Sequence, residues 1–308
     1  MVEETRLLTS DLILPLFLVS GQGTNEVIES LPVAKRQSLD HILKEIQSCT
    51  KLGLNQFVLF PSVPEKFKDK FGTYSHSIDN FYLEAARTIK EEFPDICLIS
   101  DVALDPYSSD GHDGVVENGI ILNDVTLPIL AKMSVAQAQA GFDIIAPSDM
   151  MDGRITTIRT ALDKADYTDV GIMAYTAKYA SGFYGPFRDA LDSAPKAGDK
   201  KTYQMNPANR REAMIEAELD IDEGADYIMV KPAIHYLDII SDLRRAYNVP
   251  IAAYHVSGEC AQLLAAAKLG WLDYDTVMPE AVLSIKRAGA DIILTYFAKE
   301  LAMKFSQG

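Results

Sequence analysis

The sequence predicts an α/β fold of the TIM, or (β/α)8, barrel type. Eight short apolar segments alternate with segments of helical period along the 308 residues. Most of the apolar segments are apolar on both faces, which is typical of strands in a buried parallel sheet. A doubly wound sheet is the structural alternative, but the chain has no glycine-rich phosphate loop. Eight alternating units therefore favour closure into a barrel.

The expected elements follow one another without a linker or a low-complexity segment. The expected strands cover residues 14–19, 56–61, 97–104, 142–148, 171–178, 227–232, 251–257 and 291–297. The expected helices cover residues 38–46, 78–92, 124–140, 155–165, 210–223, 236–247 and 274–287. Several helices end at a glycine, which readily adopts the left-handed conformation that closes a helix. We therefore predict one domain over residues 1–308, with a short N-terminal arm at 1–11.

The composition is that of a globular protein. Hydrophobic residues make up 48% and charged residues 24% of the chain, which excludes a disordered or collagen-like protein. The net charge of −15 argues against a protein that binds nucleic acid through its phosphates. No apolar run near the acidic N-terminus approaches the ~20 residues of a membrane span, and this N-terminus is unlike a signal peptide. Cys49, Cys97 and Cys260 are widely spaced, so we expect no disulfide framework, no cysteine-rich zinc site and a cytoplasmic protein.

Two lysines lie at the expected ends of neighbouring strands, Lys178 on the fifth and Lys231 on the sixth. Chemistry in a TIM barrel takes place at the carboxyl ends of the strands, and paired strands lie ~4.8 Å apart. Burial and mutual repulsion lower the pKa of a lysine, and the neutral amine attacks a ketone to form a Schiff base. A single lysine at a strand end is more often a solvated surface charge. Two such lysines inside apolar segments indicate a pair of nucleophiles.

The loop after the third expected strand is rich in acidic residues. The strand end and the loop carry Asp101, Asp105, Asp110, His112 and Asp113. Closely spaced carboxylates repel one another unless a cation lies between them, and all-oxygen ligands favour Mg²⁺ over zinc. The alternative is a solvated acidic turn, and the residues alone leave both interpretations open.

A long connection at residues 179–206 follows the fifth expected strand and is predicted to be an active-site lid. It contains Arg188, Lys200 and Lys201, and a basic cluster in a chain of net charge −15 indicates capture of a substrate carboxylate. The alternative is that these are ordinary exposed cations. Ser257 and Tyr296, at the ends of the last two strands, offer hydroxyl groups for orienting a polar substrate group. Taken singly, each is more often a structural hydroxyl.

Several longer segments occur in collinear order over nearly the whole chain. They read SDVALDPY at 100–107 with GHDG at 111–114, APSDMMDGR at 146–154, FYGPFR at 183–188, YQMNP at 203–207, MVKP at 229–232 and VSGE at 256–259. Together these segments closely resemble the porphobilinogen synthase (5-aminolaevulinate dehydratase) family. The resemblance implies a TIM-barrel lyase that condenses two 5-aminolaevulinate molecules to porphobilinogen, with loss of two waters, in tetrapyrrole (haem) synthesis.

The resemblance also implies a role for individual residues. Lys231 and Lys178 resemble the family's Schiff-base lysines for the A-side and P-side substrates, and Asp101 resembles the aspartate beside them. The remaining implied substrate ligands are Arg188, Lys200 and Gln204 for the A-side carboxylate, and Ser257 and Tyr296 for the P-side carboxylate.

The metal expectations follow from the loop after the third strand. Zinc-dependent members of the family carry three cysteines there, whereas this sequence has Ala103, Asp105 and Asp113. The loop therefore resembles the branch that uses Mg²⁺ or K⁺, and no catalytic zinc is expected. Whether Asp105 and Asp113 hold Mg²⁺, K⁺ or no ion is left open. Glu216 matches the position of the family's allosteric Mg²⁺ glutamate.

The sequence departs from the family pattern at four positions on the rim of the expected site, namely Asp110, His235, His255 and Cys260. These departures put rate and metal preference in question more than the type of reaction. In the family the N-terminal arm wraps a neighbouring subunit and supports an octamer. A homo-oligomer is therefore expected, with an octamer as the first expectation and a hexamer or a dimer left open by the short arm.

Two other functions are compatible with a barrel of this kind. The first is an aldolase-like enzyme that forms a Schiff base with a keto acid on Lys231 alone. The second is an inactive homologue with an assembly or regulatory role. Such a homologue would be expected to have lost one of the lysines or the lid arginine, but Lys178, Lys231 and Arg188 are all present.

Overall fold

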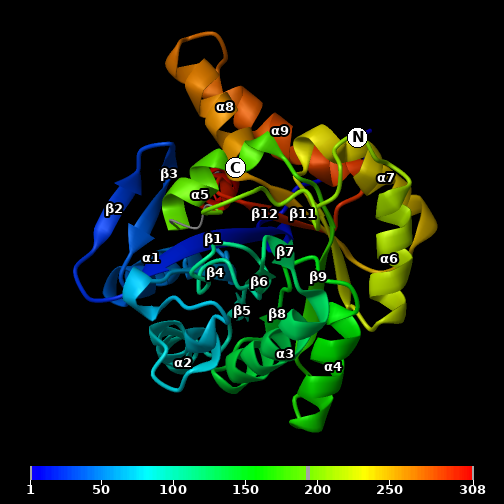
Figure 1. Ribbon diagram of the computed structural model, residues 1–308. Coiled ribbons are helices and arrows are strands. Elements are labelled where there is room, and N and C mark those ends of the chain that lie inside the picture. Colours follow the sequence, from blue (N-terminus) through cyan, green and yellow to red (C-terminus); the bar gives the residue numbers. More distant parts are fainter. Residues whose placement is uncertain (1, 192–194, 307–308) are drawn as a thin grey trace.

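Eight parallel strands close into a barrel in the computed structural model, which describes residues 2–191 and 195–306 (Figure 1). The barrel strands are β1 (Leu12–Val19), β4 (Gln56–Ser62), β5 (Cys97–Ile99), β8 (Ile144–Ile145), β9 (Gly171–Lys178), β10 (Tyr227–Lys231), β11 (Ile251–His255) and β12 (Ile292–Thr295). Each strand pairs with the next in this order, and β12 pairs with β1 to close the barrel. The prediction of a TIM barrel is confirmed.

Helices surround the barrel because their apolar faces pack on the outer faces of the strands (Figure 1). They are α1 (Leu39–Thr50), α2 (Phe81–Glu92), α3 (Asn123–Gln139), α4 (Arg154–Lys164), α6 (Glu212–Asp222), α7 (Leu237–Ala246), α8 (Ser257–Lys268), α9 (Tyr274–Ala288) and α10 (Ala298–Phe305). A shorter helix, α5 (Gly185–Leu191), lies in the segment between β9 and α6. Apart from Ala103, the buried apolar side chains form one contiguous cluster.

The strands expected at 97–104 and 142–148 are shorter in the structure, at β5 and β8. Beyond them the two segments stay in contact through an isolated parallel bridge between Val102 and Pro147. The backbone then leaves the ladder to form the loops at the barrel mouth. The shortening therefore results from the loops that carry the acidic residues.

Several elements were not predicted. An antiparallel hairpin of β2 (Asn25–Ile28) and β3 (Leu31–Gln37) follows β1, and a small hairpin of β6 (Val116–Glu117) and β7 (Ile120–Ile121) lies in the loop after β5. Helices α8 and α10 were also missed, and α8 and α9 project together from the barrel (Figure 1). Ser257 was expected to end a strand, but it begins α8 instead. The strand ends at His255 because the next residues supply the first turn of that helix.

In the described residues, no helix is long and apolar enough to cross a membrane. Residues 2–8 of the expected arm form neither helix nor strand, and residues 9–11 form a single 3₁₀ turn before β1.

Candidate active site

The two lysines predicted as nucleophiles face each other across neighbouring strands. Lys178 on β9 is the direct ladder partner of Lys231 on β10, and each side chain is almost fully buried. In β9, residues 175 and 176 lie opposite a single residue of β10, which is a β-bulge. Tyr175 and Lys178 would point to opposite faces of a regular strand. The bulge brings them to the same side, with Lys178 Nζ 5.8 Å from the centre of the Tyr175 ring.

Lys231 Nζ lies among four aromatic rings. The ring centres of Tyr175, Tyr184, Phe187 and Tyr254 are 5.0, 5.3, 5.0 and 4.5 Å away, respectively. Within the described part of the chain, this ammonium nitrogen donates no hydrogen bond and forms no ion pair. Burial, together with repulsion by the nearby Lys178, lowers the pKa of Lys231 to about 7. A substantial neutral fraction is therefore present near neutral pH, as a Schiff-base nucleophile requires.

Asp101 lies just beyond β5 and faces the lysine pair. Burial, reinforced by the negative charge of Asp105, raises the pKa of Asp101 to about 7. Lys178 Nζ donates hydrogen bonds to the backbone oxygen of Ser148 and, over 3.3 Å, to Asp113 Oδ2. The site therefore combines the amine of Lys231, whose pKa is lowered to about 7, with the carboxyl group of Asp101, whose pKa is raised to about 7.

Ion pairs join the lid to the acidic loop after β5. Lys200 Nζ lies 3.2 Å from Asp105 Oδ2 and also donates to Asp113 Oδ1. Burial would lower the pKa of Lys200, but the two carboxylates outweigh it and raise that pKa. Burial would likewise raise the pKa of Asp113, but Lys178 and Lys200 outweigh it and lower that pKa. His112 adds contacts from its ring nitrogens to the oxygen of Ala197 and the hydroxyl of Tyr203, so the loop and the lid are held together.

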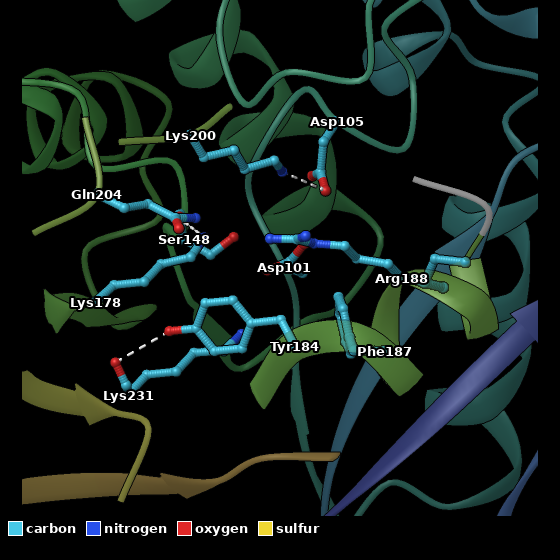
Figure 2. Close-up of a pocket in the computed structure, with 11 residues that line it drawn as sticks. Asp101, Asp105, Ser148, Lys178, Tyr184, Phe187, Arg188, Lys200, Gln204 and Lys231 are labelled. Carbon is cyan, nitrogen blue, oxygen red and sulfur yellow. Dashed lines mark hydrogen bonds and ion pairs between the residues drawn. The ribbon is translucent and has the colours of Figure 1, made fainter. Parts of the chain in front are cut away.

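These groups surround one cavity at the barrel mouth (Figure 2). Its lining includes seven of the predicted site residues: Asp101, Asp105, Lys178, Arg188, Lys200, Gln204 and Lys231. Arg188 extends from α5 toward the centre of the group (Figure 2). Gln204 Oε1 is buried without a hydrogen-bond partner, which marks it as an acceptor available to a bound molecule. The free space is about 30 Å³, enough for a water molecule or two.

Ser257 and Tyr296 do not line this cavity. The hydroxyl of Ser257 accepts a hydrogen bond from the Phe187 N–H and donates one to the oxygen of Phe183. The hydroxyl of Tyr296 bonds to that of Tyr254 over 3.0 Å. Ser257 therefore bonds to the segment that precedes and begins α5, and Tyr296 joins the aromatic cluster. Their roles as substrate ligands stay predictions.

Glu216 lies outside the active-site cavity, on α6, and lines a separate cavity of about 510 Å³ together with Asp152 and Glu212. Burial, with the negative charge of Asp220, raises the pKa of Glu216. Asp220 itself forms a buried ion pair with Arg154 at 3.0 Å. A positive charge beside this carboxylate would stabilise its ionised form.

Among the described residues, no three or more His, Cys, Asp or Glu side chains are gathered as a metal-binding group. Asp105 and Asp113 come together as predicted, and Lys200 already supplies a positive charge between them. None of the three cysteines lines the active-site cavity, whose lining contains no thiol. The donor set near the lysines is therefore one of carboxylate oxygens.

The four departures from the family pattern also lie outside the cavity lining. The backbone oxygen of Asp110 accepts a hydrogen bond from the lid at Lys196. His255 is fully buried against Cys260, and burial lowers the pKa of His255 to about 4. His235 is exposed on one side and contacts Glu259.

The sequence prediction missed the aromatic wall and Ser148. Tyr184 and Phe187 lie within a quoted motif, so their proximity to the lid arginine was a usable signal. Tyr175 and Tyr254 gave no such signal, because their orientation depends on the β9 bulge and on barrel closure. Ser148, which follows β8, contributes its backbone oxygen to Lys178, and a backbone atom leaves no trace in the residue type.

Comparison with known proteins identifies the family of this chain. The delta-aminolevulinic acid dehydratase family matches residues 1–304. The chain is 53% identical over 302 residues to the chloroplastic delta-aminolevulinic acid dehydratase of Physcomitrium patens, covering 97% of this chain and 70% of that protein. It is also 51% identical over 305 residues to the delta-aminolevulinic acid dehydratase of Bradyrhizobium diazoefficiens, and the match covers 99% of this chain and 86% of that protein.

A solved structure gives the same result for the fold. The Toxoplasma gondii ME49 delta-aminolevulinic acid dehydratase (porphobilinogen synthase), in complex with its reaction product porphobilinogen, superposes with a TM-score of 0.97. That protein is 48% identical to this chain, and the match covers 98% of this chain and 87% of the other. The fold, the paired lysines and the full-length sequence match together show that this chain belongs to the delta-aminolevulinic acid dehydratase family.

Proposed function

We propose that this chain forms porphobilinogen from two molecules of 5-aminolaevulinate, using Lys178 and Lys231 as Schiff-base nucleophiles. The observation that carries the proposal is the pairing of these two buried lysines on adjacent strands in one cavity. Each amine attacks a ketone carbon, and the ketone oxygen leaves as water. Two substrates held side by side then react as if within one molecule, which removes much of the entropic cost of their encounter.

The surroundings of Lys231 support its role toward the A-side substrate. Its lowered pKa supplies the neutral amine, and the rings around Nζ present faces that stabilise a cationic iminium after the adduct forms. An iminium withdraws electrons from the neighbouring carbon and makes its proton easier to remove. Asp101 has a pKa near 7, so it is suited to accept and return a proton at neutral pH.

The lid supplies the positive charge for a substrate carboxylate. Arg188 and Lys200 reach the cavity from α5 and from the segment before α6, and Gln204 adds an unpaired acceptor. A substrate carboxylate would compete with Asp105 and Asp113 for Lys200, so substrate entry and lid opening are linked. We assign Ser257 and Tyr296 to the second carboxylate, which requires both to exchange their present partners.

For metals, the residues fit carboxylate-liganded ions better than zinc. We propose that Glu216 holds a hydrated Mg²⁺ that acts at a distance from the lysines, in keeping with its partly buried carboxylate beside a cavity. Asp105 and Asp113 supply oxygen donors, but Lys200 already balances part of their charge. An ion there, Mg²⁺ or K⁺, would have to share these carboxylates with Lys200 or displace it.

We also propose that the chain assembles into a homo-oligomer, with an octamer as the first expectation. Ile215 and Leu219 are spaced four residues apart on α6 and are 58% and 50% exposed, which favours burial against another subunit. Size-exclusion chromatography with light scattering measures the mass, and a monomer at micromolar concentration would contradict the proposal.

The activity is tested by mixing purified protein with 5-aminolaevulinate and measuring porphobilinogen. The conditions are Mg²⁺, excess EDTA, and EDTA followed by Zn²⁺ or by Mg²⁺. Product is expected with Mg²⁺, and an EDTA-treated sample should recover with Mg²⁺ but not with Zn²⁺. Lys231→Ala should form no product while remaining folded.

Borohydride trapping of Schiff-base adducts, run beside this assay, separates the other functions. An aldolase-like enzyme would form an adduct on Lys231 but make no porphobilinogen, and Lys178→Ala would leave that adduct intact. An inactive homologue would form neither adduct nor product. No product from folded wild-type protein under any of the conditions would refute the proposed function.

A further inference from the structure

A buried carboxylate outside the cavity connects the Lys231 strand to the base of the lid. Glu259 lies in the first turn of α8 and is fully buried. It does not line the active-site cavity, and the mechanism above makes no use of it. A buried carboxylate is costly unless hydrogen bonds satisfy it, so its partners show what it holds in place.

Three of the four donors to Glu259 come from the segment just after Lys231. Oε2 accepts from the backbone N–H of Ala233 over 3.3 Å, and Oε1 accepts from the backbone N–H of His235 over 3.3 Å. The ring Nδ1 of His235 lies 3.2 Å from Oε1. The fourth donor is the N–H of Val256, at 3.0 Å from Oε2. A helix cap alone would account only for the Val256 contact.

The same cluster reaches the lid. The ring of His235 stacks on the ring of Phe183, with centres 4.2 Å apart and planes inclined by 19°. Phe183 lies in the turn that precedes α5, and its backbone oxygen accepts a hydrogen bond from Ser257 at the start of α8. Glu259 therefore contacts residues 233–235, which follow Lys231 in the chain. Through the ring of His235 it also supports Phe183, which precedes Arg188 in the lid.

We propose that Glu259 is a positioning residue that fixes the chain after Lys231 relative to the lid base, so that Lys231 Nζ stays within its aromatic surroundings. The inference rests on the proposed function, because it concerns the amine that forms the A-side adduct. Without the carboxylate, two backbone N–H groups after Lys231 lose their acceptor, and the strand end is free to shift. Small shifts at a reacting group have large effects on rate.

The test is adduct trapping in Glu259→Gln. Borohydride reduction in the presence of 5-aminolaevulinate converts each Schiff base to a stable amine, and peptide mass spectrometry measures labelling at Lys231 and Lys178 separately. The Gln side chain keeps the shape but turns an NH₂ group toward two N–H donors. We expect the ratio of Lys231 to Lys178 labelling to fall about tenfold, with a lower kcat.

The matched control is Glu300→Gln, which makes the same chemical change at a half-buried carboxylate on α10 that bonds to Tyr274. It is expected to keep the wild-type labelling ratio, since a general loss of stability does not favour one lysine over the other. Glu259→Asp keeps the charge on a shorter side chain and should give a ratio between wild type and Glu259→Gln. It also decides the question if Glu259→Gln does not fold.

A wild-type ratio in a folded Glu259 variant would overturn the inference. A different result, no adduct on either lysine of the wild-type protein, would instead refute the proposed function. The two failures are therefore distinguishable in one experiment.

Discussion

Replacing Gly258 with alanine tests how closely the lid base is seated on α8. A Cβ at Gly258 would lie 2.5 Å from the backbone oxygen of Phe183 and 2.7 Å from its Cα. Ordinary contact begins near 3.4 Å, so the two segments must separate by about 0.9 Å. Both clashing atoms belong to the backbone, and no side-chain rotation relieves the contact.

A displacement of Phe183 would pass to the active site through the residues that follow it in the lid. The Phe187 N–H donates a hydrogen bond to the hydroxyl of Ser257, and Arg188 directly follows Phe187 in α5. Misplacement of a binding group by ~1 Å costs on the order of 100-fold in rate. We therefore expect kcat/KM for porphobilinogen formation to fall about 100-fold in Gly258→Ala, which corresponds to ~2.7 kcal/mol in activation free energy.

The assay is initial-rate porphobilinogen formation over a range of 5-aminolaevulinate concentrations, with thermal unfolding to confirm that the variant is folded. Gly182→Ala is the control, because a Cβ there meets no atom within 4 Å. It should stay within about twofold of wild type, since its methyl group displaces nothing. The reasoning is refuted if folded Gly258→Ala keeps kcat/KM within threefold of wild type, or if Gly182→Ala loses as much.

Three further predictions address the amine, the lid and the metal. Because the pKa of Lys231 is lowered to about 7, its protonated form dominates at pH 6 and its neutral form at pH 8. The amount of trapped Lys231 adduct should therefore rise between pH 6 and pH 8. Lys178→Met removes a repelling positive charge and should move the midpoint of this rise to higher pH. An unchanged midpoint would contradict the view that Lys178 lowers the pKa of Lys231. Arg36 on β3 donates hydrogen bonds to the backbone oxygens of Ala190 and Asp189 in the lid, so Arg36→Ala should raise KM severalfold. Lys35 is the exposed neighbour, and Lys35→Ala should leave KM unchanged. Equal KM values for the two variants would count against a role for the Arg36 contact. Glu216→Ala should weaken stimulation by Mg²⁺ in a titration of EDTA-treated protein, and an identical titration curve would place the ion elsewhere.

The alternation of apolar and helical segments was sufficient to predict the barrel. Strands that end in Lys178 and Lys231 are consecutive, and parallel strands in a barrel bring their carboxyl ends to one rim. The side-by-side placement of the lysines follows from chain order alone. The position of Arg188 in a long connection over the same rim follows from the same argument.

Local signals were weaker where strand and helix compete or where strands are short. The segment 25–37 forms a hairpin in which exposed and partly exposed positions separate the buried ones, so it lacks the continuous apolar run that identified the barrel strands. Ser257 follows an apolar strand without a break in composition. Only the hydrogen bonds of the next turn show that it begins a helix.

The sequence by itself therefore determined the barrel, the order of its strands and the residue types at its mouth, because these depend on periodicity and chain order. The tertiary structure decided which charges meet. Lys200 pairs with Asp105 and Asp113 although the two segments are some ninety residues apart, and no local pattern encodes such a contact. It also decided the environment of the nucleophile, because the bulge in β9 turns Tyr175 toward the lysines and burial shifts the pKa of Lys231. Desolvation and long-range charge act through space, and only the folded chain fixes those distances.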